Sequence, residues 1–167
     1  MPLERSALRP WTFYCLLGLL SVSGMRLGEA RNLEVRDVDV TTGVLTIRGT
    51  KFGKSRLVPL HDSTREVLAD YIVRRNRHWA GRPVSSYLFV SNRGNRLDGA
   101  EVHRTFYALS RQVGLRGGSD HHGPRLHDMR HNSEAKIIPS AISIAVDMRR
   151  RCSTGFGCGA HFLGIIL

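Results

Sequence analysis

Cysteine is scarce in this sequence of 167 residues, which contains only Cys15, Cys152 and Cys158. The number is odd and no two of them form a CxxC pair, so neither a disulfide framework nor a cysteine-based zinc site is predicted. A reducing compartment, the cytoplasm, is therefore the expected location. Long apolar runs are also missing, because the longest, Trp11 to Val22, is shorter than the about 20 apolar residues that cross a bilayer.

Two explanations fit that apolar run. Basic residues precede it and small residues follow it, which is the order found in a signal peptide. Glu4 in the leading segment, and Trp11 and Tyr14 within the run, are untypical of such a signal. We therefore interpret the run as a buried helix over about Pro10 to Val22, and we expect no membrane partner.

Lysine and acidic side chains are few as well. Only Lys51, Lys54 and Lys136 are lysines among 25 basic residues, and 14 acidic residues leave a net charge of +11. This imbalance favours a polyanion, such as nucleic acid or an anionic membrane face, as the partner, and no small-molecule substrate is expected. Arginine suits bidentate binding of phosphate, although coding composition explains most of the excess of arginine over lysine.

The length and the 41% hydrophobic content suit one compact domain.

The residue periodicity predicts a mainly α-helical α+β chain with a small β-sheet. Apolar residues at helical spacing predict helices over about 10–22, 26–33, 63–77, 98–113 and from 125 to 131. Capping boxes are expected at Ser63–Glu66 and Asp98–Glu101. Alternation over 44–48 and 56–60 predicts a β-hairpin whose turn presents Lys51 and Lys54, and residues 87–90 are expected to form a short strand.

Arg26 and Arg130 are candidates for a phosphate clamp. Each guanidinium can hold two phosphate oxygens and can stabilise the extra charge of a pentacoordinate transition state. In a chain with so many arginines, two of them are more often solvated surface groups. Their surroundings favour a site, because Glu29 lies three residues after Arg26 at helical spacing, and His127 lies three residues before Arg130.

Three motifs in this order resemble the catalytic domain of the tyrosine recombinases, the phage-integrase family. They are SGMRLGEARNL, a lysine-bearing hairpin that ends in KSRLVPL, and RLHDMRH. The resemblance runs from about residue 5 to His131. It implies a mainly helical fold with a small sheet packed on one side. It also implies that double-stranded DNA is cut and rejoined through a 3′-phosphotyrosyl intermediate, with no metal or nucleotide cofactor.

The resemblance assigns roles position by position. Arg26 and Arg130 match the two arginines that clamp the scissile phosphate. Lys51 matches the hairpin lysine that donates a proton to the departing 5′ oxygen, and Lys54 could take that role or contact the DNA backbone, as Arg56 is also expected to do. His127 matches the histidine that assists proton transfer at the attacking hydroxyl, although a histidine at a helix start also bonds readily to backbone.

The pattern ends after His131. The family places its nucleophilic tyrosine further on, but all four tyrosines of this sequence precede Arg130, and residues 132–167 contain none. No other hydroxyl in that segment matches the missing nucleophile. We therefore predict a truncated catalytic domain over 1–131 that lacks its nucleophile, followed by an atypical tail over 132–167 that is either read out of frame or disordered.

Three further interpretations fit the sequence. The chain could be a non-enzymatic, DNA-binding remnant that competes with full-length recombinases. A full-length recombinase protomer bound to the same DNA could supply the tyrosine in trans. In a third reading, His127 and His131 lie four residues apart, as the zinc ligands of metalloproteases do, which would make HDxxH a metallohydrolase motif. Asp128 is shorter than the usual glutamate base and no convincing third ligand follows, so no metal site is predicted.

Overall fold

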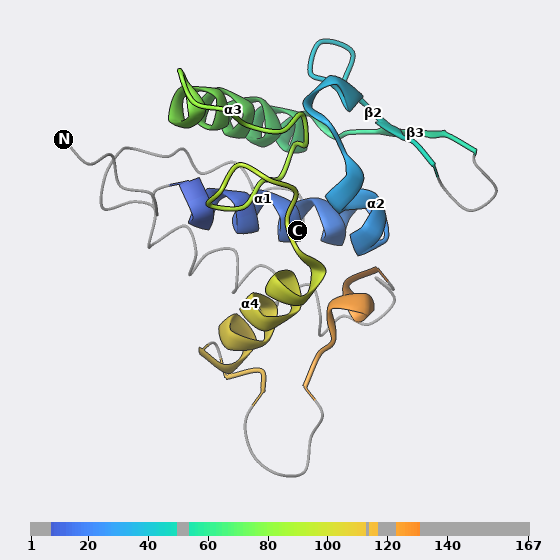
Figure 1. The fold of residues 1–167 in the computed structure, drawn as a ribbon. Coiled ribbons are helices and arrows are strands. Elements are labelled where there is room, and N and C mark those ends of the chain that lie inside the picture. Colours follow the sequence, from blue (N-terminus) through green and yellow to red (C-terminus); the bar gives the residue numbers. More distant parts are fainter. Residues whose placement is uncertain (1–7, 50–53, 113, 117–122, 131–167) are drawn as a thin grey trace.

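A long buried helix lies at the centre of the fold. The computed structural model describes residues 8–49, 54–112, 114–116 and 123–130. Helix α1 (Leu8–Ser23) runs through the middle of the molecule, with helix α3 (Asp62–Trp79) packed on one side and the short 3₁₀ helix η3 (Leu126–Arg130) on another (Figure 1).

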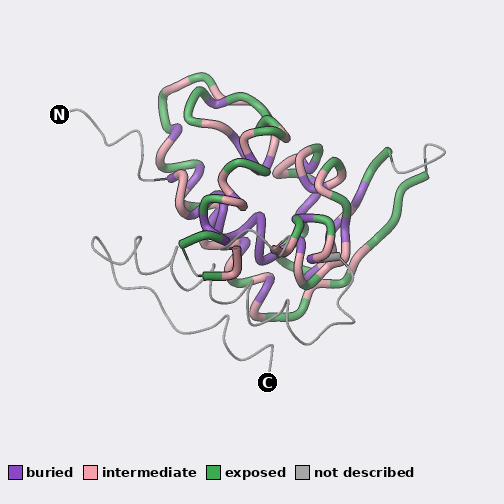
Figure 2. Tube along the Cα trace, turned by 90° about the horizontal axis from the view of Figure 1, so that it is seen from below, coloured by how far each residue is buried: buried purple, intermediate pink, exposed green. Residues whose placement is uncertain are grey.

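The sequence of α1 explains its central place. Every residue from Trp11 to Leu20 is buried (Figure 2). A helix that is apolar on all faces is stable only when other elements cover it all round. The expected core helix over 10–22 is therefore confirmed, and it extends slightly at both ends.

A small antiparallel sheet follows the second helix. Helix α2 (Leu27–Asn32) and the 3₁₀ turn η1 (Val35–Asp37) lead into β1 (Val38–Asp39), β2 (Val44–Ile47) and β3 (Arg56–Pro59), which lie in the order β1-β2-β3. The β2–β3 hairpin confirms the expected one, and Leu45 and Ile47 of β2 point into the core. Strand β1 was not expected, because two residues are too short to show an alternating pattern.

Two further helices complete the core. Within α3, Leu68 and Tyr71 are fully buried, and helix α4 (Gly99–Gln112) buries Val102, Phe106 and Leu109 along one face. Gly114 follows α4 with a positive φ of 75°, the conformation in which glycine commonly ends a helix. The amphipathic pattern of α4 leaves its other face, which includes His103, to solvent.

Three local expectations were wrong. Helix α3 begins one residue earlier than predicted, because the ring of His61, rather than the hydroxyl of Ser63, accepts the hydrogen bond of the first turn. Residues 87–90 form only isolated bridges, Glu34 with Tyr87 and Val90 with Arg96, and not a strand. The segment that starts at Arg125 forms a 3₁₀ helix and not an α-helix over the described residues.

Candidate functional site

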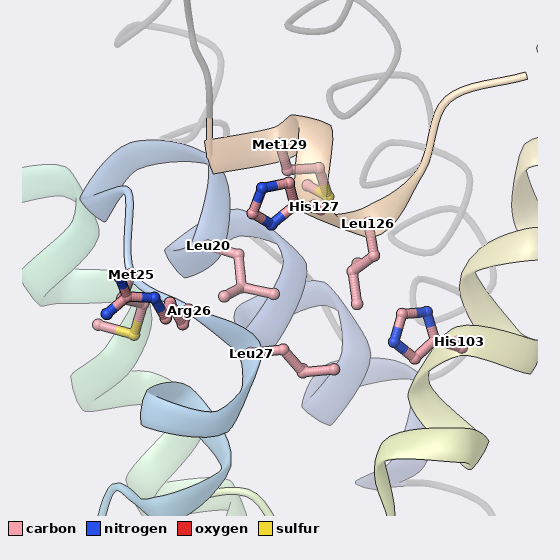
Figure 3. A pocket seen from close by; sticks show the side chains of 8 residues that line it. All are labelled: Leu20, Met25, Arg26, Leu27, His103, Leu126, His127 and Met129. Carbon is pink, nitrogen blue, oxygen red and sulfur yellow. The ribbon is translucent and has the colours of Figure 1, made fainter. Parts of the chain in front are cut away.

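A pocket of about 190 Å³ opens between the consecutive helices α1 and α2 and two elements that are distant from them in the sequence, α4 and η3. Figure 3 shows side chains from α1, from the start of α2, from α4 and from η3 around the same space. Apolar residues form much of the wall, and the polar groups are Arg26, His103 and His127. The lining residues are Leu20, Met25, Arg26, Leu27, His103, Leu126, His127 and Met129.

The chain reversal between α1 and α2 places Arg26 at this pocket. Gly24 adopts a positive φ of 61° just after α1 ends, and Arg26 then takes the extended conformation of a residue that precedes a helix. Its carbonyl accepts the bond from the N–H of Ala30 that starts α2, at 3.0 Å. The Arg26 side chain is 53% exposed, so its guanidinium is accessible to a ligand.

Glu29 holds Arg26 in this position. One carboxylate oxygen, Oε2, accepts a hydrogen bond from the backbone N–H of Arg26 at 2.8 Å, and Oε1 pairs with Nη1 of Arg26 at 3.4 Å. Burial raises the pKa of Glu29, but the Arg26 backbone bond and the charges of Arg56 and Arg26 outweigh it, so the pKa is lowered overall. Glu29 is thus ionised at neutral pH and orients Arg26.

The 3₁₀ helix η3 brings His127 to the opposite side of the pocket. Leu126 and Met129 are buried and fix the turn against α1, while His127 is exposed between them. The N–H of Arg125 donates to the carboxylate of Asp128 at 2.7 Å, which closes the first turn. Because a 3₁₀ helix has three residues per turn, position 130 lies on the same side as His127. The side chain of Arg130 itself lies outside the described residues.

The structure describes some of the other predicted site residues and not others. Lys51 lies outside the described residues, as do His131 and the rest of the tail. Lys54 is exposed shortly before β3. Arg56, the first residue of β3, donates through Nη2 to Glu29 at 3.0 Å. His103 lines the pocket and was missed, because the sequence shows only that it belongs to the polar face of α4.

None of the four tyrosines, all of which are described, lines the pocket. Tyr14 and Tyr71 are buried, and Tyr87 and Tyr107 are partly buried. The hydroxyl of Tyr71 donates to the carbonyl of Leu88 at 3.2 Å, and burial raises its pKa. A neutral, buried phenol cannot attack an external phosphate, so Tyr71 is structural.

Among the described residues, histidine, cysteine and acidic side chains form no group of three that could hold a metal ion. The HDxxH alternative also needs His131, which is not described. In the part of the chain that the structure describes, no helix is long and apolar enough to cross a membrane.

Comparison with known sequences identifies a family. The Phage integrase family model matches residues 5–146, which extends beyond the motif that ends at His131. The putative integrase/recombinase y4rB of Sinorhizobium fredii is 70% identical over 127 residues, which are 76% of this chain and 40% of y4rB. Type 1 fimbriae regulatory protein FimE of Escherichia coli is 32% identical over 106 residues, covering 64% of this chain and 51% of FimE. The chain thus spans about half or less of these relatives.

Solved structures show the same fold. The crystal structure of XerA recombinase aligns with a TM-score of 0.59 at 21% identity, covering 94% of this chain and 61% of XerA. XerH site-specific recombinase bound to its difH substrate aligns with a TM-score of 0.58 at 20% identity, covering 93% of this chain and 47% of XerH. The expected mainly helical α+β fold with a small sheet is therefore confirmed.

Proposed function

The chain belongs to the phage integrase family, the tyrosine recombinases, and we propose that it binds double-stranded DNA and activates one phosphodiester for strand cleavage and rejoining. The observation that carries this proposal is the convergence of Arg26 and His127 on one pocket, although 100 residues separate them in the sequence. An exposed guanidinium held by an ionised carboxylate is suited to bind a phosphate that carries growing negative charge.

Each proposed role follows from the chemistry of the side chain. Arg26 and Arg130 clamp the two non-bridging oxygens of the scissile phosphate. Lys51 donates a proton to the 5′ oxygen as it leaves, and in the reverse reaction its amine takes that proton back. His127 exchanges a proton with the attacking phenol. These steps use no metal or nucleotide cofactor, and Lys54 adds a contact to the DNA backbone.

The covalent step needs a tyrosine from another protomer. No tyrosine of this chain lines the pocket, and none occurs after Tyr107. We therefore propose that a full-length recombinase protomer on the same DNA supplies the phenol. The chain alone then binds and polarises a phosphate but forms no phosphotyrosyl bond, so it acts as a catalytically defective recombinase domain.

The charge and the relatives support DNA as the partner. The net charge of +11 favours a polyanion. Among proteins of the same fold, XerH was solved with its difH substrate, and the Tn1549 transposon integrase was solved with circular intermediate DNA. DNA partners of this kind are consistent with a cytoplasmic location, which we propose for this chain too.

A strand-sealing assay tests phosphate activation without a tyrosine. The substrate is a nicked duplex with a 5′ hydroxyl on one side and a 3′ phosphate esterified to 4-nitrophenol on the other. The hydroxyl attacks phosphorus, the bond to nitrophenol breaks, and the proton of the hydroxyl passes to the Lys51 amine. Randomising the base pairs around the nick removes the need to know the target, because amplification across the sealed junction recovers the sequences that react. We expect sealing by the wild-type chain above an Arg26→Ala control.

The same assay separates the alternative functions. A non-enzymatic remnant would bind the duplex and seal nothing. The HDxxH metallohydrolase would contain stoichiometric zinc after purification and would lose its activity to a chelator, whereas the proposed sealing is insensitive to chelators. Sealing that is equal in wild type and Arg26→Ala would contradict the proposal, because the clamp would then contribute nothing.

A further inference from the structure

The base of the hairpin is tied to the rest of the molecule by ion pairs on both strands. Arg48, which follows β2, pairs with the buried carboxylate of Asp37. Arg56, at the start of β3, pairs with Glu29 at 3.0 Å. Only the second pair reaches the pocket, because Glu29 also holds Arg26. We propose that Arg56 is a positioning residue that acts through Glu29 on Arg26. The inference rests on the proposed function.

The geometry of Glu29 makes the coupling direct. Its Oε2 accepts from both the Arg26 backbone N–H at 2.8 Å and Nη2 of Arg56 at 3.0 Å. A single oxygen thus joins the first turn of α2 to the first residue of β3, across 27 positions of sequence. The Glu29 side chain is 10% exposed, whereas Arg26 and Arg56 are 53% and 42% exposed, so the carboxylate is the fixed member and both guanidinium groups remain in contact with solvent.

The charges explain why two arginines share this carboxylate. With Arg26 alone, the negative charge of Glu29 would neutralise the cation that must attract the phosphate. Arg56 offsets that charge, so the three groups together carry a net charge of +1. Without Arg56, we expect Arg26 to be drawn towards Glu29 and to bind the developing charge of a transition state less strongly.

The register shows which residue pair of the hairpin Arg56 anchors. Ile47 pairs with Arg56 as the last residue pair of the β2–β3 ladder. The ion pair between Arg56 and Glu29 therefore ties this end of the ladder to α2. A misplacement of about 1 Å at a reacting group can lower a rate by about a hundredfold, so an anchor at this point affects the reaction without contact with DNA.

The test is a double-mutant cycle measured as the sealing rate at saturating DNA. We expect Arg56→Gln to lower that rate by about tenfold to a hundredfold. Arg56→Lys should restore most of it, since the observed contact uses a single N–H. Combining Arg56→Gln with Glu29→Gln should give a rate no slower than Arg56→Gln alone, because both changes remove the same coupling. Arg65→Gln, which removes a paired cation from α3, is the matched control and should keep the wild-type rate.

The dependence of DNA affinity on salt separates this role from a direct phosphate contact. A positioning residue leaves the slope of log affinity against log salt unchanged. A cation that contacts phosphate changes the slope by about 0.9 when it is removed.

The inference is overturned if Arg56→Gln seals at the wild-type rate, if the loss lies in affinity and slope, or if the double variant loses the product of both single effects. Absence of sealing by the wild-type chain would instead contradict the proposed function itself. Equal unfolding midpoints for Arg56→Gln and Arg65→Gln exclude a folding defect.

Discussion

At the scale of single residues, the site combines groups that the sequence identified with contacts that it could not show. Arg26 and His127 were predicted from their motifs, and both line the pocket. The bond between Glu29 and Arg56 joins α2 to a strand 27 positions away, so no local spacing reveals it. His103 was missed for the same reason, since helical periodicity indicates an exposed face and not what that face meets.

The role proposed for His127 predicts a dependence on the leaving group. Nitrophenolate leaves without a proton, whereas phenolate, which resembles the tyrosine side chain, needs one. We expect His127→Gln to reduce sealing only slightly with the nitrophenyl ester and by about a hundredfold with a 3′ phenyl ester. Rates with both esters on one DNA sequence check this. Equal losses for the two esters would show that His127 binds the phosphate and does not transfer a proton.

The lowered pKa of Glu29 predicts how stability changes with pH. A carboxyl whose pKa is lower in the folded state stabilises the fold above its ordinary value of 4.5, and this contribution is lost as the pH falls through the lowered folded value. The unfolding free energy of the wild type should therefore exceed that of Glu29→Gln near neutral pH, and the difference should shrink under acid conditions. Urea unfolding at several pH values measures it. A difference that grows on acidification would contradict the ionised state of Glu29.

At the scale of elements, the strongly periodic segments were predictable and the irregular ones were not. Helices α1 and α4 and the β2–β3 hairpin follow their sequence patterns closely. Residues 87–90 have the apolar run of a strand, yet Leu88 and Phe89 are buried in a segment with only isolated bridges. A buried segment is apolar whether or not it forms the hydrogen bonds of a β-sheet, so the sequence alone cannot distinguish a strand from a buried irregular segment.

Two glycines in the segment after α3 are expected to differ in how much an alanine substitution lowers the unfolding free energy. Both have positive φ, 71° at Gly81 and 78° at Gly94, but a Cβ at Gly81 meets open space. At Gly94 it would lie 3.1 Å from the carbonyl oxygen of Pro83 and 3.2 Å from the Trp79 ring. We expect Gly81→Ala to lower the unfolding free energy by about 1 kcal/mol and Gly94→Ala by about 2 kcal/mol or more. Urea midpoints compare them, and equal losses would contradict the close packing at Gly94.

At the scale of the whole molecule, composition indicated the class of partner, and the fold brings together the residues that we propose to bind it. The net charge of +11 could belong to many basic proteins. The pocket supports the proposed phosphate site, because the Arg26 side chain is exposed while Glu29 holds its orientation. The arginine total alone does not show this, since several arginines make contacts within the fold, as Arg74 does with Asp70 and the Trp11 ring.

The overall charge also predicts how DNA binding responds to salt. If Arg26, Lys51, Lys54 and Arg130 contact phosphates, log affinity should fall linearly with log salt, by roughly a hundredfold between about 50 and 200 mM. Fluorescence anisotropy with a labelled duplex measures this. An affinity that does not change with salt would contradict binding through the phosphate backbone.

The central claim is that this chain activates a DNA phosphate but provides no nucleophile of its own. One denaturing gel tests it directly, with two labelled nicked substrates of the same sequence. The first carries the 3′ nitrophenyl phosphate, and the second carries an ordinary phosphodiester beside a nick, which traps any covalent protein–DNA adduct. The account predicts sealing of the first substrate, lowered about a hundredfold or more in Arg26→Ala, and no adduct on the second. An adduct formed by this chain alone, or sealing at the same rate in Arg26→Ala, would contradict it.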